Sequence, residues 1–181
     1  MRPRIVTYRA DGWGVGAAWF DERGRLVQHE LPRVQEHPHP GRGSDPPPAL
    51  RSTLPARGAQ VANATGPKVE QLVHRFAAYF GGAADRFGDV ELDLDWCTPF
   101  QHAVATALRS VPRGEVVTYG ELAALAGYPN AHRAAGTFCA RNRFGLVVPC
   151  HRVVAATGIG TYGSSGVEYK RRLLELEGVV V

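Results

Sequence analysis

The sequence is poor in the features that mark several protein classes. It has only three cysteines, Cys97, Cys139 and Cys150, and no two of them form a CxxC pair. This odd, sparse set argues against a disulfide framework and a structural zinc site, and favours reduced thiols inside a cell. No apolar run approaches the roughly 20 residues that cross a bilayer. The basic residues 1–4 are not followed by an apolar segment. We therefore expect no membrane span and no secretory signal, hence a cytoplasmic protein.

Positive charge is unevenly distributed along the 181 residues. The formal net charge is +4. Residues 1–96 hold twelve Lys and Arg against twelve Asp and Glu, whereas residues 97–181 hold nine against five. The whole excess therefore lies in the second half. This placement favours contact between that half and a polyanion, although charge alone is a weak signal.

The first half reads as a small α/β unit. Two strand-like segments within residues 17–31 flank a polar loop that closes on Gly24, which predicts a hairpin. A stretch rich in Pro and Gly follows over residues 36–65 and predicts a loop or linker. Apolar residues at helical spacing predict a helix over residues 69–80. Alternating apolar and acidic residues predict a half-exposed strand over residues 90–95. None of these segments contains a residue that we predict to be catalytic.

Three helices are predicted in the second half. Thr98 and Thr118 each begin a capping-box pattern, and Asn130 is positioned to cap a third helix that extends to about Ala140. The second helix should end at Gly127, so two short helices are joined by a tight turn, as in a helix-turn-helix. The first helix carries one apolar stripe: Phe100, Ala103, Val104, Ala107, Leu108 and Val111.

The third helix combines small residues with arginines. Arg133, Thr137 and Arg141 lie four apart and therefore share one face. Small side chains allow close approach to another surface, and the helix is rich in them: Ala131, Ala134, Ala135, Gly136 and Ala140. Two interpretations remain open at this point. The helix could dock into a DNA groove, or it could be a tightly packed core helix with solvated arginines.

The most reactive segment lies at residues 146–154. An apolar run predicts a buried strand that delivers Cys150, followed directly by His151. A thiolate is the attacking form of cysteine, and an imidazole can take the thiol proton directly or through one water. Adjacent residues of a strand point to opposite faces, so cooperation requires a bend or a bridging water. The alternative is a buried structural cysteine beside an unrelated histidine.

Residues 149–154, Pro-Cys-His-Arg-Val-Val, match the active-site signature of the O6-alkylguanine-DNA alkyltransferases, also called methylated-DNA–protein-cysteine methyltransferases. Further segments resemble the family in order and spacing: Phe100-Gln101, residues 117–123, residues 133–136, Asn142 and residues 173–178. The resemblance implies two domains. Residues 1–96 would form a small α/β, RNase H-like domain, and residues 97–181 a mostly helical, winged helix-turn-helix alkyltransferase domain.

The resemblance also implies a reaction. Cys150 would take the alkyl group from guanine O6 by in-line displacement, irreversibly and once per molecule, without cofactor or metal. O4-alkylthymine is a further expected substrate. His151 would relay a proton through water, and Glu177 would orient His151. We expect Glu177 at the C-terminal end of a helix capped by Ser165 and Glu168, where the helix dipole disfavours a carboxylate and suggests that it serves a partner.

The partner implied by the resemblance is double-stranded DNA, contacted in the minor groove by a monomer associated with the nucleoid. Arg133 resembles the arginine finger that fills the space of the flipped base, and Tyr119 the tyrosine that promotes rotation of the nucleotide. Ala134 and Thr137 belong to the helix that would enter the groove. Contacts there should be to backbone and shape, with little sequence preference.

Other matched residues would form the guanine pocket. Asn142 resembles the asparagine that braces the turn before the active cysteine. Tyr162 would line the pocket, the backbone near Gly163 and Ser164 would donate to the guanine oxygen, and carbonyls near Cys150 and Val153 would accept from its exocyclic amine.

The sequence departs from the family pattern at Arg143, at Phe138-Cys139 and in its Ser-rich loop after Tyr162, which bears on pocket size. The main alternative is a non-catalytic sensor of alkylguanine in DNA, in which the nucleophile is replaced; Cys150 argues against it. A helix-turn-helix regulator leaves the Cys-His segment unexplained, and a Cys-His hydrolase would require an oxyanion hole and turnover.

Overall fold

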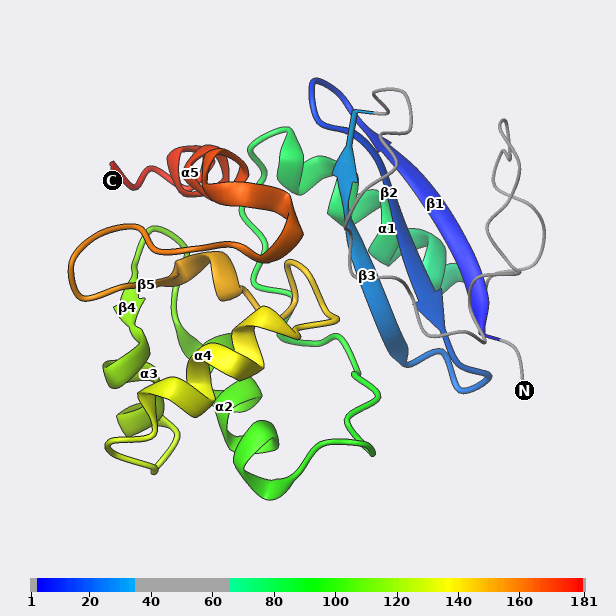
Figure 1. Cartoon of the computed structure of the whole chain (residues 1–181). Helices are drawn as coiled ribbons and strands as arrows, with labels where there is room; N and C mark the ends of the chain where they lie inside the picture. Colours follow the sequence, from blue (N-terminus) through cyan, green and yellow to red (C-terminus); the bar gives the residue numbers. More distant parts are fainter. Residues whose placement is uncertain (1–2, 35–65, 181) are drawn as a thin grey trace.

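The computed structural model describes residues 3–34 and 66–180 and shows a mixed α/β fold (Figure 1). The elements, in chain order, are β1 (Arg4–Ala10), β2 (Gly14–Phe20), β3 (Leu26–Arg33), α1 (Pro67–Phe80), α2 (Pro99–Ser110), β4 (Val117–Thr118), α3 (Tyr119–Leu125), α4 (His132–Ala140), η2 (Cys150–Arg152), β5 (Val153–Val154), η3 (Gly163–Ser165) and α5 (Gly166–Leu176). Within these two ranges, no helix is long and apolar enough to cross a membrane.

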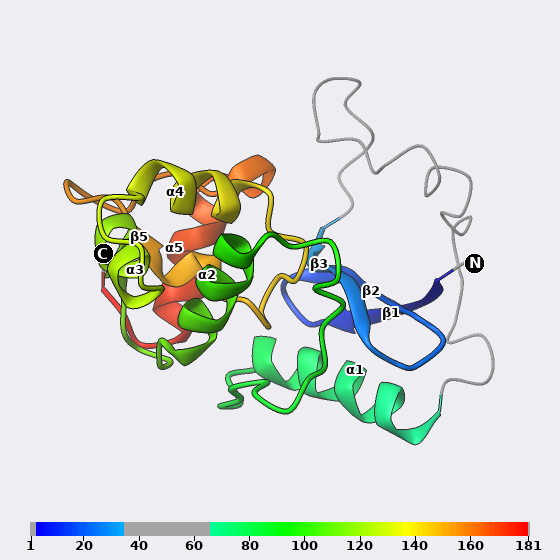
Figure 2. The same cartoon turned by 90° about the horizontal axis from the view of Figure 1, so that it is seen from below.

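The N-terminal part is a three-stranded antiparallel sheet, in the order β1-β2-β3, with α1 packed against it (Figure 2). The predicted hairpin is confirmed as β2 and β3, and the predicted helix as α1. Gly81 forms the C-cap of α1, as its sequence position suggested. The helix buries one apolar face: Val69, Leu72, Val73, Phe76, Tyr79 and Phe80.

The C-terminal part is mainly helical, with a small parallel pair formed by β4 and β5. Both predicted capping boxes are confirmed. The side chain of Thr98 accepts from the Gln101 amide at the start of α2, and that of Thr118 from the Glu121 amide at the start of α3. Helices α3 and α4 pack together, as a helix-turn-helix requires. The linker predicted at residues 36–65 lies outside the described residues.

Residues 90–95 do not form the predicted strand. Leu92 makes one isolated parallel bridge to Leu26, and the chain turns away at once. Two acidic residues of this segment, Asp93 and Asp95, instead form ion pairs with Arg25. The alternation of apolar and acidic residues therefore corresponds to a short contact with the edge of the sheet. The apolar residues point inward, and the carboxylates point toward Arg25.

One predicted helix cap is wrong, and a second occupies its predicted position without the capping hydrogen bond. Asn130 has φ +74°, a left-handed conformation, and α4 begins only at His132 with Ala131 at its N-cap. Asn130 therefore ends the turn between helices and caps neither. Ser165 lies at the N-cap of α5 without a capping hydrogen bond, because its hydroxyl accepts from Arg33 of the N-terminal part.

A buried histidine joins the two parts of the molecule. His29 in β3 is 4% exposed, its ring stacks on Phe76, and its Nε2 hydrogen-bonds the Tyr8 hydroxyl at 2.7 Å. Its backbone amide donates to the carbonyl of Arg143 at 2.7 Å. Gly145 lies so close that a Cβ there would meet the imidazole at 2.3 Å. The sheet thus packs directly against the segment that leads to Cys150.

Burial lowers the pKa of His29 from 6.5 to about 3, so the folded protein holds this ring neutral. Below pH 6.5 His29 becomes protonated in the unfolded chain but stays neutral in the folded chain. The free energy of unfolding therefore decreases as the pH falls below 6.5. We predict that His29 accounts for about 2–3 kcal/mol of the stability lost between pH 6.5 and 4.5. Urea unfolding of His29→Gln should show a weaker fall over this window, whereas exposed His74→Gln should behave as the wild type. Equal slopes for both variants would contradict this assignment.

Candidate active site

Cys150 is the first residue of a short 3₁₀ helix, not the end of a strand. Residues 145–149 form consecutive turns, so the predicted strand is wrong. Gly145 has φ +45°, and Pro149, with φ −79° and ψ 68°, makes an inverse γ-turn in which the Cys150 amide bonds the Val148 carbonyl at 2.8 Å. This geometry projects Cys150 from a rigid, buried loop. The residue as a whole is only partly buried.

Asn142 fixes this loop through its side-chain amide. Its Oδ1 accepts from the Phe144 amide at 3.0 Å, and its Nδ2 donates to the Val148 carbonyl at 2.7 Å. The same Nδ2 lies 3.1 Å from Cys150 Sγ. One amide group therefore satisfies the loop backbone and contacts the sulfur.

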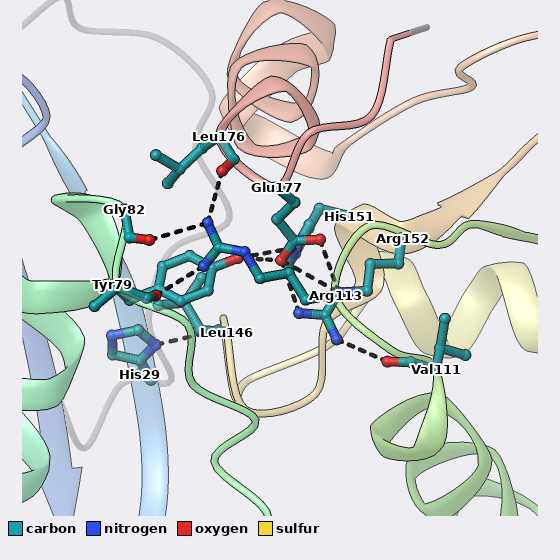
Figure 3. A network of polar contacts seen from close by, with 11 residues as sticks. His29, Tyr79, Gly82, Val111, Arg113, Leu146, His151, Arg152, Leu176 and Glu177 are labelled. Carbon is teal, nitrogen blue, oxygen red and sulfur yellow. Dashed lines mark hydrogen bonds and ion pairs between the residues drawn. The ribbon is translucent and has the colours of Figure 1, made fainter.

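His151 belongs to a buried ionic cluster at the end of α5 (Figure 3). Its Nε2 lies 2.9 Å from Glu177 Oε1, and both side chains are fully buried. Arg152 donates to both Glu177 oxygens, from Nη2 at 2.7 Å and from Nε at 2.9 Å, and its Nη1 bonds the Val111 carbonyl. The carboxylate that the helix dipole disfavours does serve partners, as its position suggested.

The charges of this cluster follow from burial and hydrogen bonding. Burial alone would raise the pKa of Glu177, but hydrogen bonds from His151 and Arg152 outweigh it and hold that pKa well below its usual range. Burial lowers the pKa of His151 despite the facing carboxylate, which favours a neutral ring. An ionised Glu177 requires a proton on His151 Nε2, which leaves Nδ1 with a free lone pair. Nδ1 is buried and has no hydrogen-bond partner within the described part of the chain.

Burial also determines the resting charge of the Cys150 sulfur. Burial raises the pKa of Cys150, and hydrogen bonds from Asn142 and Tyr162 oppose this only in part. The resting group is therefore a thiol that must lose its proton to react. The neighbouring neutral His151 has a lone pair on Nδ1 that is free to take this proton.

Lysine 170 organises the loop predicted to bind guanine. Its ammonium is buried in α5 and donates to the carbonyls of Val153 at 2.5 Å, Ile159 at 2.6 Å and Thr161 at 3.5 Å. The Val153 carbonyl assigned to the guanine amine therefore already accepts one hydrogen bond, and a second lone pair remains. Tyr162 is buried and lies beside Cys150.

The rest of this loop lies at the surface. Gly163 and Ser164 are exposed, and the Ser164 hydroxyl accepts from Arg33 of β3 at 3.1 Å. Sequence reasoning had not linked the N-terminal sheet to this loop.

The residues assigned to DNA lie on α3 and α4. Tyr119, the first residue of α3, is half-buried, and burial raises its pKa, so its hydroxyl stays protonated. It packs against α4, where a Cβ on Gly136 would lie 3.8 Å from its ring. Arg133, Ala134 and Thr137 are all exposed, which places them on the outer face of α4. The structure thus has two distinct parts of the candidate site: the polar groups around Cys150, and the exposed outer face of α4.

The sequence did not predict that three further residues belong to the site: Tyr79, Arg152 and Lys170. Lys170 carried a usable signal, since it occurs on the same helical face as Leu173 and Leu174 and could only be buried with partners. Arg152 stood inside the signature but without a role. Tyr79 gave no signal, because nothing local links it to Glu177. Among residues 3–34 and 66–180, no group of three or more His, Cys, Asp or Glu is placed to hold a metal ion.

Comparisons with known proteins identify the family. A family model described as the DNA-binding domain of 6-O-methylguanine DNA methyltransferase matches residues 99–179. The methylated-DNA–protein-cysteine methyltransferase of Methanopyrus kandleri is 40% identical over 132 residues, covering 72% of this chain and 96% of that protein. This chain belongs to the methylated-DNA–protein-cysteine methyltransferase family. The family expected from the sequence is therefore confirmed.

Mycobacterial relatives extend the comparison. The protein of the same name from Mycobacterium tuberculosis strain H37Rv is 47% identical over 105 residues; the match spans 58% of this chain and 62% of that relative's length. The crystal structure of Mycobacterium tuberculosis O6-methylguanine methyltransferase superimposes with a TM-score of 0.70 at 31% identity, covering 97% of this chain and 92% of that one. A structure of Mycobacterium tuberculosis OGT in complex with DNA has a TM-score of 0.66 at 30% identity, covering 98% and 92%.

Removal of the Lys170 ammonium should loosen the loop beside Cys150. In Lys170→Met the side-chain stem is kept, but the carbonyls of residues 153, 159 and 161 lose their shared donor. We predict a loss of about 2–3 kcal/mol in the free energy of unfolding, with faster amide hydrogen exchange over residues 153–161. Lys68→Met, at an exposed position of α1, is the control. Unchanged exchange in that loop would show that Lys170 does not hold it.

Proposed function

We propose that this protein repairs DNA by direct reversal of O6-alkylguanine, moving the alkyl group irreversibly to its own Cys150. The observation that carries this proposal is the arrangement at residues 150–151. The thiol of Cys150, a partly buried residue, is contacted by the Asn142 amide and precedes a buried His151 whose Nε2 is held by ionised Glu177. A structural cysteine needs no such neighbour, and a non-catalytic sensor needs no nucleophile.

The proposed reaction is a single displacement. Cys150 gives its proton to His151 Nδ1 through one water, and the resulting thiolate attacks the alkyl carbon. The S–C bond forms as the C–O6 bond breaks, and the electron pair of that bond leaves with the guanine, which takes up a proton. The thioether product is stable, so each molecule would act once. The same geometry would accept O4-alkylthymine, whose alkyl group is also bound to an exocyclic oxygen.

The target base must leave the helical stack to reach Cys150. The exposed face of α4 would enter the minor groove of double-stranded DNA, where Ala134 and Thr137 allow close approach and Arg133 fills the space of the flipped nucleotide. Tyr119, a protonated donor between α4 and the cysteine, would hydrogen-bond the extruded base. Gly163, Ser164 and Tyr162 would form the opposite side of the guanine pocket.

This proposal includes the finer architecture. The sheet with α1 would be an RNase H-like domain over residues 1–96, and residues 97–181 a winged helix-turn-helix domain. A single copy contains all the proposed groups, which supports a monomer. A protein with this substrate would work at the nucleoid.

The transfer itself is tested with Cys150→Ser. This variant should bind duplex DNA containing O6-methylguanine with wild-type affinity but gain no mass, because serine is a far weaker nucleophile than a thiolate. Intact-mass and peptide analysis of the wild type should show one added methyl on Cys150 and none on Cys97 or Cys139. Binding without any methyl on the wild type would identify a sensor, and repeated product release would identify a hydrolase.

The role of the α4 face is tested with Arg133→Ala. Loss of the side chain that replaces the flipped base should slow methyl transfer from duplex DNA by about tenfold to a hundredfold, the effect of about 1.4–2.7 kcal/mol. Transfer from single-stranded DNA should change far less, because no stack must be opened. Arg9→Ala, an exposed arginine of β1, is the matched control. Equal slowing on both substrates would rule out a finger role.

A further inference from the structure

Tyr79 crosses from the N-terminal part of the molecule into the proposed proton relay. It lies in the last turn of α1, is 1% exposed, and its hydroxyl donates a hydrogen bond to Glu177 Oε1 (Figure 3). The same hydroxyl lies 3.5 Å from His151 Nε2. Glu177 Oε1 is also the oxygen that holds His151 at 2.9 Å. A side chain of α1 therefore touches the atom that orients the histidine.

Packing alone does not explain a tyrosine at this position. The ring of Tyr79 contacts the rings of Phe80 and Phe87, and neither contact requires a hydroxyl. A phenylalanine would fill nearly the same volume there, and a buried hydroxyl stabilises only when it finds a partner. The partner that it finds is a carboxylate already held by Arg152. The hydroxyl thus adds a third donor side chain to a group whose charge is already balanced.

Arg113 fixes the relative position of Tyr79 and Glu177. Its guanidinium donates to the Leu176 carbonyl at 2.6 Å and to the Ala83 carbonyl at 2.7 Å, just beyond the end of α1. It also lies over the Tyr79 ring, 5.2 Å from the centroid. One cation therefore ties the backbone just beyond α1, the helix of Tyr79, to the backbone next to Glu177. The contact between them is built into the interface.

We propose that Tyr79 is a positioning residue for alkyl transfer, through which the N-terminal part of the chain sets the geometry and basicity of the Glu177–His151 pair. This inference rests on the proposed function. The hydroxyl fixes the rotation of the carboxylate, so that Oε1 faces His151 Nε2. It also shares the lone pairs of Oε1, which weakens the hold of Glu177 on a protonated imidazole. His151 thereby remains neutral and able to accept the Cys150 proton near neutral pH.

Several charged or titratable groups face the His151–Glu177 pair, and their pKa values determine which group a pH profile of the reaction would report. They are Tyr79 from α1, Arg113 from the loop after α2, Arg152 from η2, and Lys170 from α5. Hydrogen bonds with Glu177 raise the pKa of Arg152 although burial opposes this, and burial raises the pKa of Tyr79, so neither of these groups titrates on the acid side of neutrality. A change in the acid limb after a substitution at Tyr79 therefore reports His151.

Tyr79→Phe in the full chain is the test. We expect single-turnover methyl transfer, at saturating O6-methylguanine duplex, to slow by about tenfold at pH 7, because one hydrogen bond to a charged group is lost. The acid limb of the rate should move to higher pH by about half a unit or more, as an unshared Oε1 retains the imidazolium. DNA affinity should stay within about twofold, since Tyr79 lies far from the α4 face in the fold and is buried. Alkylation of Cys150 by iodoacetamide without DNA, followed by peptide mass, should slow in parallel.

Tyr169→Phe is the matched control. The Tyr169 hydroxyl donates to the Pro32 carbonyl at 2.8 Å, so this variant removes a hydroxyl contact across the same interface without touching Glu177. It should keep the wild-type rate and pH profile. If Tyr79→Phe matches Tyr169→Phe in both rate and profile, Tyr79 is only structural and the inference is overturned.

If Tyr79→Phe folds poorly, a second replacement at the same position tests the inference. 3-Fluorotyrosine at position 79 keeps the ring volume and makes the hydroxyl a stronger donor, so the acid limb should move to lower pH. A shift to higher pH, or none, overturns the inference. Absence of methyl transfer by the wild type would overturn the proposed function instead, and the iodoacetamide profiles would then decide the role of Tyr79 by themselves.

Discussion

The structure depends on one buried carboxylate. Glu177 lies just past the last turn of α5, where both the helix dipole and desolvation oppose its charge. It remains ionised only because three donor side chains reach it from two other elements: Tyr79 from α1, and His151 and Arg152 from η2. Any relative movement of these elements would leave the buried charge of Glu177 without its partners, which costs several kcal/mol. The requirement to satisfy Glu177 therefore holds the N-terminal part, the cysteine segment and α5 in one arrangement.

The same requirement determines the protonation of the site. An ionised Glu177 takes the Nε2 proton of His151 as its hydrogen bond and leaves Nδ1 as an acceptor. Burial meanwhile keeps Cys150 a thiol. A thiol reacts slowly with stray electrophiles and oxidants, which matters for a residue proposed to react only once. On this view the nucleophile becomes active when a substrate occupies the pocket and the proton can pass to His151.

Much of the fold could be predicted because its signals are local. Thr98 and Thr118 each begin a capping box that marks the start of a helix, and the apolar residues of α2 recur at helical spacing. The failures arose where distant partners override the local pattern. The apolar run at residues 146–148 resembles a strand, yet Gly145, the Asn142 amide and Pro149 satisfy its backbone in turns. Ser165 resembles a cap, yet Arg33 takes its hydroxyl. Tyr79 and Lys170 meet their partners only after the chain has folded.

The turn at Cys150 resolves a difficulty that the sequence raised. In a strand, adjacent side chains point to opposite faces, so Cys150 and His151 could serve one reaction only through a bridging water. In a 3₁₀ helix, with three residues per turn, adjacent side chains diverge by about 120°. Cys150 can then stay partly exposed to a substrate while His151 and Arg152 turn inward to Glu177. In the proposed reaction, three consecutive residues would thereby have different roles: Cys150 would meet the substrate, His151 would accept a proton, and Arg152 would balance the charge of the carboxylate that orients His151.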